Sequence, residues 1–163
     1  MRFVLLDRIV SLDAGARAAG FRQIPEDDDY FVDHFPGYPV VPGVILLESM
    51  AQLGGRLIQV SVREASAREV LPMLAMVDRA HFRRPVKPGE RLDVTAELTS
   101  LSADRARVTA AASVGGQGAA SATIIYVLID LARGAIDVSP EVADGIRRWD
   151  EAVWRELTAP AAT

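Results

Sequence analysis

The spacing of apolar residues changes twice along the chain. Residues 4–13 and 16–24 favour two strands around Asp13-Ala14-Gly15, which is a turn signal. From Val44 to Val60 there is no proline, and apolar side chains recur at three- and four-residue steps. This pattern predicts a helix that is apolar nearly all round. From Leu71 onward the period changes to two, which predicts four long strands over residues 71–83, 91–101, 105–114 and 119–131.

The order of these elements predicts an α+β fold, in which an antiparallel sheet of about six strands wraps around one long central helix. We expect this domain to cover residues 1–138 and a helical tail to cover residues 139–163. Ser139 can cap a helix that starts at Pro140. The tail also carries one apolar stripe, with Trp154 beside it, made of Val142, Ile146, Trp149, Val153 and Leu157. An amphipathic helix over 140–157, packed on the domain or on a neighbouring subunit, is therefore predicted.

Composition excludes several classes of function. The 163 residues include no cysteine, so disulfides and thiolate chemistry are excluded, and the two histidines lack zinc-ligand spacing. A net charge of −4 argues against nucleic acid as a partner. The apolar runs are too short for a membrane span or a signal peptide, so we expect a cytoplasmic protein. The acidic run Glu26–Asp29 is interpreted as a solvated helix start.

Two residues in the first third of the chain are candidate catalytic residues. His34 begins a ten-residue loop with three prolines and two glycines, which cannot be regular structure. Glu48 lies on the apolar helix and is the only charged residue between His34 and Arg56. A carboxylate in such a setting costs several kcal/mol if it is ionised without partners. Each residue alone could serve packing, and for Glu48 a structural and a catalytic role both stay open.

Together the two residues fit the elimination of water. A neutral imidazole can take a proton near neutral pH, and a carboxylic acid in an apolar pocket can stay protonated and donate one. A thioester carbonyl that gains negative charge also needs a donor. The helix that begins near Gly43 and Val44 offers unpaired backbone N–H groups and a favourable dipole.

Three separated motifs resemble one known family. They are Val4-Leu5-Leu6-Asp7-Arg8-Ile9, the stretch His34-Phe35-Pro36-Gly37 to Gly43-Val44 running on to Glu48-Ser49-Met50-Ala51-Gln52, and Ala80-His81-Phe82-Arg83-Arg84-Pro85-Val86-Lys87-Pro88-Gly89-Glu90. In this order they look like the 3-hydroxyacyl-[acyl-carrier-protein] dehydratases of the FabZ and FabA type. The likeness covers about residues 3–130, so the tail lies outside it.

The resemblance implies a hotdog fold and a homodimer with active sites shared between subunits. Assembly of three dimers into a hexamer stays open. It implies His34 and Glu48 as the catalytic pair, Gly43 with Val44 as donors to the thioester carbonyl, and Gln52 as support for the acid. Glutamate at position 48 favours the FabZ type, which dehydrates without moving the double bond. No metal or organic cofactor is implied. Tyr38 and His81 differ from the residues that the family more often has at these positions. These differences bear on which substrate is used more than on the reaction.

The implied partner is an acyl carrier protein that holds a 3-hydroxyacyl chain, for fatty-acid or specialised lipid or polyketide synthesis. Because acyl carrier protein is acidic, a basic docking surface is expected. The candidates are Arg79, Arg83, Arg84 and Lys87, with Arg56 as a further one. Two other functions stay open: a non-catalytic acyl-binding hotdog subunit of a heteromeric dehydratase, and a hotdog acyl thioesterase.

Overall fold

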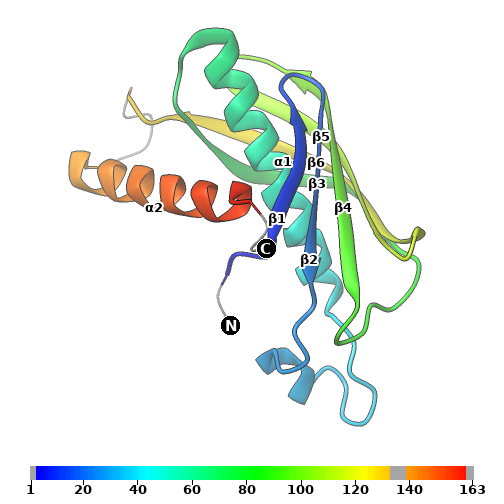
Figure 1. Ribbon diagram of the computed structural model, residues 1–163. Helices are drawn as coiled ribbons and strands as arrows, with labels where there is room; N and C mark the ends of the chain where they lie inside the picture. The colour runs from blue at the N-terminus through cyan, green and yellow to red at the C-terminus, as the bar shows by residue number, and fades with distance from the viewer. Residues whose placement is uncertain (1–2, 133–138, 161–163) are drawn as a thin grey trace.

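A six-stranded antiparallel sheet curves around one long helix in the computed structural model, which describes residues 3–132 and 139–160 (Figure 1). In chain order the elements are β1 (Arg8–Asp13), β2 (Arg17–Gln23), the 3-10 helix η1 (Asp29–Val32), α1 (Gly43–Ser66), β3 (Val70–Phe82), β4 (Arg91–Leu101), β5 (Arg105–Val114), β6 (Gln117–Asp130) and α2 (Pro140–Thr158). The strand order is β1-β2-β4-β5-β6-β3, so β1 and β3 form the two edges of this sheet. The predicted hotdog fold with an added C-terminal helix is confirmed.

Small side chains line the face of the sheet that holds α1. On β4, β5 and β6 buried positions alternate with more exposed ones, as a strand with one buried face requires. Ala96, Ala110 and Ala122 are buried and pair with one another across the three strands. Because alanine projects only a methyl group, α1 can lie close to the sheet here.

α1 lies close against the sheet at Gly54. A Cβ atom at this position would lie 2.6 Å from the hydroxyl oxygen of Tyr126 and 3.2 Å from Cγ1 of Val108. Tyr126 is buried, and its hydroxyl donates a hydrogen bond of 2.8 Å to the carbonyl of Ala51. Position 54 therefore has no room for a side chain, and Tyr126 links β6 to the middle of α1.

Two element boundaries differ from the sequence prediction by more than two residues, each for a local reason. The first strand begins at Arg8 rather than at residue 4, because the N–H of Leu5 donates to the side chain of Gln52 at 2.8 Å rather than to a strand. The central helix runs on to Ser66, six residues beyond the predicted end. Its last turn is polar and exposed, so it lacks the apolar signal that defined the helix in the sequence.

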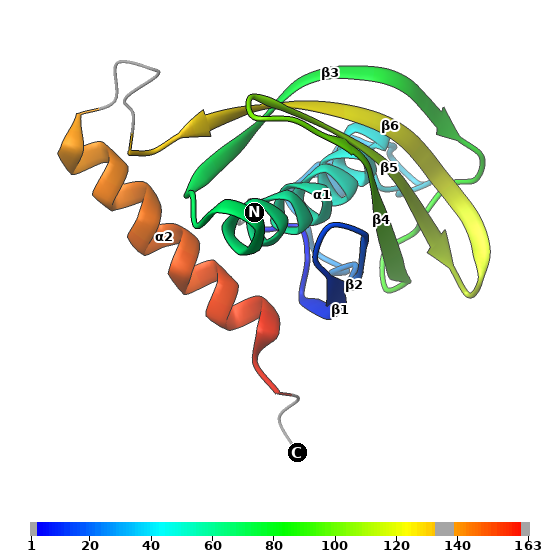
Figure 2. The ribbon, with the colours of Figure 1, turned by 90° about the horizontal axis from the view of Figure 1, so that it is seen from above.

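The C-terminal helix α2 lies outside the wrapped sheet (Figure 2). Its start follows the prediction, since the Ser139 hydroxyl accepts from the N–H of Val142 at 3.4 Å. Its packed face differs from the predicted stripe, because Val142 and Trp149 are each 54% exposed while Val153 and Leu157 are buried. The domain boundary placed at 138/139 adjoins residues 133–138, which lie outside the described residues, so that boundary stays a prediction.

Candidate active site

His34 follows η1 and begins the loop that leads into α1. The backbone N–H of His34 donates to the carbonyl of Tyr30 at 3.0 Å, and its carbonyl accepts from the N–H of Val40 at 3.0 Å. Its Nδ1 atom lies 3.0 Å from the carbonyl oxygen of Val40. A carbonyl oxygen can only accept a hydrogen bond, so Nδ1 carries the proton. In the neutral ring Nε2 is then the atom with a free electron pair, which is the arrangement a general base requires.

Gly43 is the first residue of α1, and Phe82 lies over it. The N–H groups of Ile45 and Leu46 donate to the carbonyl of Pro42, so Gly43 and its neighbour Val44 precede the first hydrogen bonds of the helix. A Cβ atom at position 43 would lie 3.1 Å from Cε1 of the Phe82 ring. The absence of a side chain therefore leaves the first N–H groups of the helix open to a ligand that Phe82 can flank.

Glu48 is half-buried and is held by Gln52 one turn later on α1. The amide of Gln52 donates to Oε1 of Glu48 at 3.0 Å and to the carbonyl of Phe3 at 3.2 Å, while its oxygen accepts from the N–H of Leu5 at 2.8 Å. All polar atoms of the Gln52 side chain thus have partners, which fixes its orientation. Gln52 thus makes the hydrogen bond to Glu48 that a residue supporting the acid would make.

A cavity of about 330 Å³ opens beside Glu48. Apolar side chains from the N-terminal segment, α1, β3 and α2 form much of its wall, among them Val4, Ala51, Leu71, Leu74 and Leu157. Tyr126 also lines it, and the pKa of this tyrosine is raised by burial and, to a smaller extent, by the nearby charge of Glu48. The apolar part of the wall suits an acyl chain next to the Glu48 carboxyl group.

The predicted catalytic residues do not meet within one chain. Gly43 lines a second cavity, of about 240 Å³, together with Phe82 and the two arginines that follow it. Five residues separate Gly43 from Glu48, and a helix turns about 100° per residue, so the two lie about 140° apart around α1. Within the part of the chain that the structure describes, His34 lines neither cavity. The base, the backbone donors and the acid thus do not share one cavity of a single subunit.

Three of the four candidate docking residues are exposed, and Arg84 is half-buried. Arg83 and Arg84 line the cavity at Gly43, and Arg84 also pairs with Glu90 at 2.8 Å. Lys87 lies over the ring of Tyr38 at 5.5 Å. Arg79 and His81 both lie on β3 and are exposed.

The suggestion that Arg56 belongs to a docking surface is wrong. Its side chain is 8% exposed and forms an ion pair with Asp150 of α2. A guanidinium that is buried and paired in this way is not available to a carrier protein.

Sequence reasoning missed the residues that reach the site from distant parts of the chain. The cavity at Gly43 is lined by Phe82, and the cavity at Glu48 is lined by Tyr126 and Trp149. The periodicity of the elements that carry these residues indicates only core or surface packing. Phe82 lies within the third family motif, whereas no local signal in the sequence identifies Tyr126 or Trp149. Their roles follow from which strands are neighbours and from where α2 docks.

No helix among residues 3–132 and 139–160 is long and apolar enough to cross a membrane. In the same residues no three His, Cys, Asp or Glu side chains form a group that could hold a metal ion.

Comparisons with solved structures define the class of fold. A dehydratase heterocomplex from Xenorhabdus doucetiae matches with a TM-score of 0.64 and 16% identity, over 78% of this chain and 84% of that one. A hypothetical thioesterase from Streptococcus pneumoniae, solved with coenzyme A, matches with a TM-score of 0.58 and 11% identity over 76% and 85% of the two chains. At such identities the likeness shows the hotdog fold alone.

Sequence comparisons define the family. The model of the FabA-like domain matches residues 1–125. The chain is 38% identical to the 3-hydroxyacyl-[acyl-carrier-protein] dehydratase FabZ of Pelotomaculum thermopropionicum over 126 residues, which are 77% of this chain and 88% of that protein. It is 34% identical to FabZ of Bacillus velezensis, over 77% of this chain and 87% of the relative. The chain therefore belongs to the FabA-like family of dehydratases, as a member of the FabZ type.

Proposed function

We propose that this chain dehydrates 3-hydroxyacyl thioesters on acyl carrier protein to trans-2-enoyl thioesters in fatty-acid synthesis. The observation that carries the proposal is the family match over residues 1–125, which include His34, Gly43 and Glu48. The FabZ relatives are named as dehydratases of that substrate class. A base, a carboxylic acid and open backbone donors are the groups that this elimination needs.

In the proposed reaction Nε2 of His34 takes the proton from C2 of the acyl chain. The N–H groups of Gly43 and Val44 bind the thioester oxygen as it gains negative charge. The C3–oxygen bond then breaks, Glu48 gives its proton to the departing hydroxyl group, and a double bond forms between C2 and C3 while water leaves. His34 ends protonated and Glu48 ionised, so transfer of one proton between them through solvent restores the starting state.

We further propose that the active unit is a homodimer joined along β3. This strand ends the sheet, and its 13 residues present an unpaired edge with Met73, Leu74, Met76 and Phe82 each at least 46% exposed. A long apolar edge of this kind is a template for pairing with another strand. Antiparallel pairing of two β3 edges would continue the sheet and carry His34 and Gly43 of one subunit toward Glu48 of the other. Association of three such dimers and a cytoplasmic location stay predictions.

A complementation experiment tests the shared site. His34→Ala and Glu48→Gln should each lower the rate of enoyl-thioester hydration, the reverse reaction, by about 10² or more. Mixed under conditions of subunit exchange, the two variants should regain part of the activity, because one of the two sites in a mixed dimer holds both wild-type groups. No recovery despite proven exchange would place both residues in one subunit's site, and near-normal activity of either single variant would remove that residue from the mechanism.

The same substrates discriminate among the three functions considered. With 3-hydroxyacyl thioesters, an increase in enoyl absorbance indicates dehydration and release of free thiol indicates a thioesterase. Absence of both signals, with acyl binding retained, indicates a non-catalytic subunit. Thioesterases among the structural neighbours do not favour the second function, because their identities of 11–17% show the fold alone.

A further inference from the structure

One face of α1 forms the floor of the cavity that begins at Glu48. Along this face the lining residues recur at helical spacing, and they are Glu48, Ala51, Gln52, Gly55, Arg56 and Gln59. Eleven residues separate the first from the last, which corresponds to about 16 Å along the helix. The cavity is therefore elongated, with the candidate acid at one end and Gln59 at the other.

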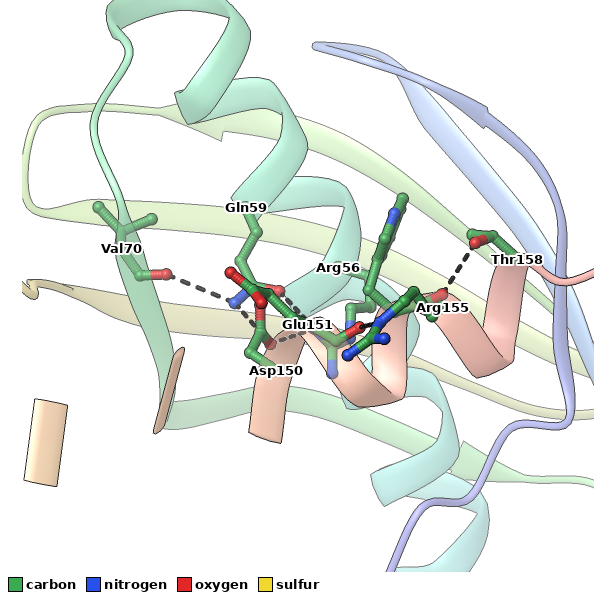
Figure 3. Close-up of polar contacts among 8 residues, drawn as sticks. Arg56, Gln59, Val70, Asp150, Glu151, Arg155 and Thr158 are labelled. Atoms are coloured by element: carbon green, nitrogen blue, oxygen red, sulfur yellow. Dashed lines mark hydrogen bonds and ion pairs between the residues drawn. The ribbon is translucent and has the colours of Figure 1, made fainter. Parts of the chain in front are cut away.

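The far end of this cavity is built by α2. Trp149 and Asp150 line it, and Asp150 forms an ion pair with Arg56. Gln59 accepts from Arg56 at 3.1 Å and donates to Asp150 at 3.2 Å, so the three polar side chains from two helices form one closed group (Figure 3). The Arg56 guanidinium carbon lies 5.8 Å from the centre of the Trp149 ring.

This end wall is additional to the family domain. The FabA-like match ends at residue 125, and α2 begins at Pro140. The FabZ relatives match 126 residues of this chain, which is 77% of its length. The family match therefore includes the Glu48 end of the cavity but not the helix that bounds its other end.

We infer that α2 closes the acyl-chain cavity of this dehydratase, and that Trp149 with the Arg56–Asp150 pair sets the longest acyl chain that the enzyme accepts. The inference rests on the proposed function. A chain whose C3 lies at Glu48 extends along this face of α1, past Ala51 and Gly55, until its terminal carbons meet the indole ring. Further carbons would have to move the indole away from the Arg56 guanidinium or break the buried ion pair of Arg56 with Asp150, and each loses a favourable interaction.

Gly55 offers a way to test the length of the cavity from its middle. This residue lines the cavity, and a Cβ atom built on it meets nothing within 4 Å. A larger side chain at position 55 would therefore enter the open space rather than the packed core. Helix propensity also improves when glycine is replaced, so folding should be retained.

The experiment measures kcat/KM for 3-hydroxybutyryl, 3-hydroxyoctanoyl and 3-hydroxydodecanoyl chains on acyl carrier protein. Trp149→Ala should raise the ratio of the longest to the shortest substrate by about tenfold or more, and Gly55→Leu should lower it by a similar factor. Trp154→Ala is the matched control, since Trp154 packs on the core and lines a different cavity. Its ratio should equal that of the wild type. Unchanged ratios in the folded Trp149 and Gly55 variants would overturn the inference.

A binding readout separates this inference from the proposed function. The chain has only two tryptophans, so Trp154→Phe leaves Trp149 as the sole emitter. Dodecanoyl-CoA should shift the Trp149 emission to the blue, whereas butyryl-CoA should not. A shift without dehydration of any substrate would retain the acyl cavity and reject the reaction. Dehydration without a shift of the Trp149 emission would reject the role of α2. The role would also be rejected if Trp149→Ala dissociated the oligomer without changing the chain-length ratio, because a second copy of the chain would then occupy the space.

Discussion

Replacing Gly54 by alanine should destabilise the protein although alanine is the better helix former. The new methyl group would lie 2.6 Å from the Tyr126 hydroxyl, which must then move away from the Ala51 carbonyl. Overpacking costs about 1–3 kcal/mol, and a buried Tyr126 hydroxyl left without a partner costs about 1–3 kcal/mol more. Relief of glycine's backbone entropy returns only about 0.5–1 kcal/mol. We expect a net loss of about 2–4 kcal/mol, or a Tm lower by about 6–12 °C for a chain of this length.

Urea unfolding followed by circular dichroism measures this loss, at one fixed protein concentration because association would add to stability. Gly55→Ala is the control on the same helix, since its methyl group meets nothing within 4 Å and should leave stability equal or higher. Tyr126→Phe removes the clashing oxygen and leaves Cζ as the nearest ring atom, at 3.4 Å. In that background Gly54→Ala should cost at least about 1 kcal/mol less. An equal cost in both backgrounds, or a Gly54→Ala protein as stable as the wild type, would refute this reasoning.

Three further outcomes are expected. Asp28→Ala should lower the free energy of unfolding by about 3–5 kcal/mol, because it leaves Arg22, whose side chain is 5% exposed, without the carboxylate that it bonds at 2.7 Å; a urea titration with no shift would contradict this. Arg83→Ala should raise KM for carrier-bound substrate more than for the coenzyme A thioester, an effect that weakens with salt, whereas Arg105→Ala at the exposed start of β5 should not. A chain ending at Asp137 should lose stability in thermal unfolding, since Val153 and Leu157 of α2 are buried; an unchanged Tm would show that α2 contributes nothing.

Most of the fold could be predicted because its elements have strong periodic patterns. The strands β4, β5 and β6 alternate buried and exposed residues, and α1 is apolar on most of its surface. Boundaries were less predictable where a side chain replaces a regular backbone partner. Gln52 holds the N–H of Leu5, and no pattern within residues 4–13 could indicate that partner 47 residues away.

The tail illustrates the same limit on a larger scale. Ser139 and Pro140 marked the start of α2 because capping is a local property. Which face of α2 would be buried depends on where the helix docks. The ion pair from Arg56 to Asp150 draws the helix toward α1 and leaves Trp149 half-exposed at the cavity, whereas a regular stripe would have buried it. Apolar periodicity alone therefore could not predict which face of α2 is buried.

The candidate site was predictable as residue types but not as a place. Elimination of water needs a base at C2, an acid at the C3 hydroxyl and donors at the thioester oxygen, whereas α1 presents Gly43 and Glu48 about 140° apart. In the described subunit Gly43 and Glu48 accordingly line separate cavities. A two-fold axis at the β3 edge would solve this, because an isologous interface generates each contact twice. The N-terminus of each α1 would then serve one site and its second turn the other, so each site would take its N–H donors from one copy of the helix and its acid from the other.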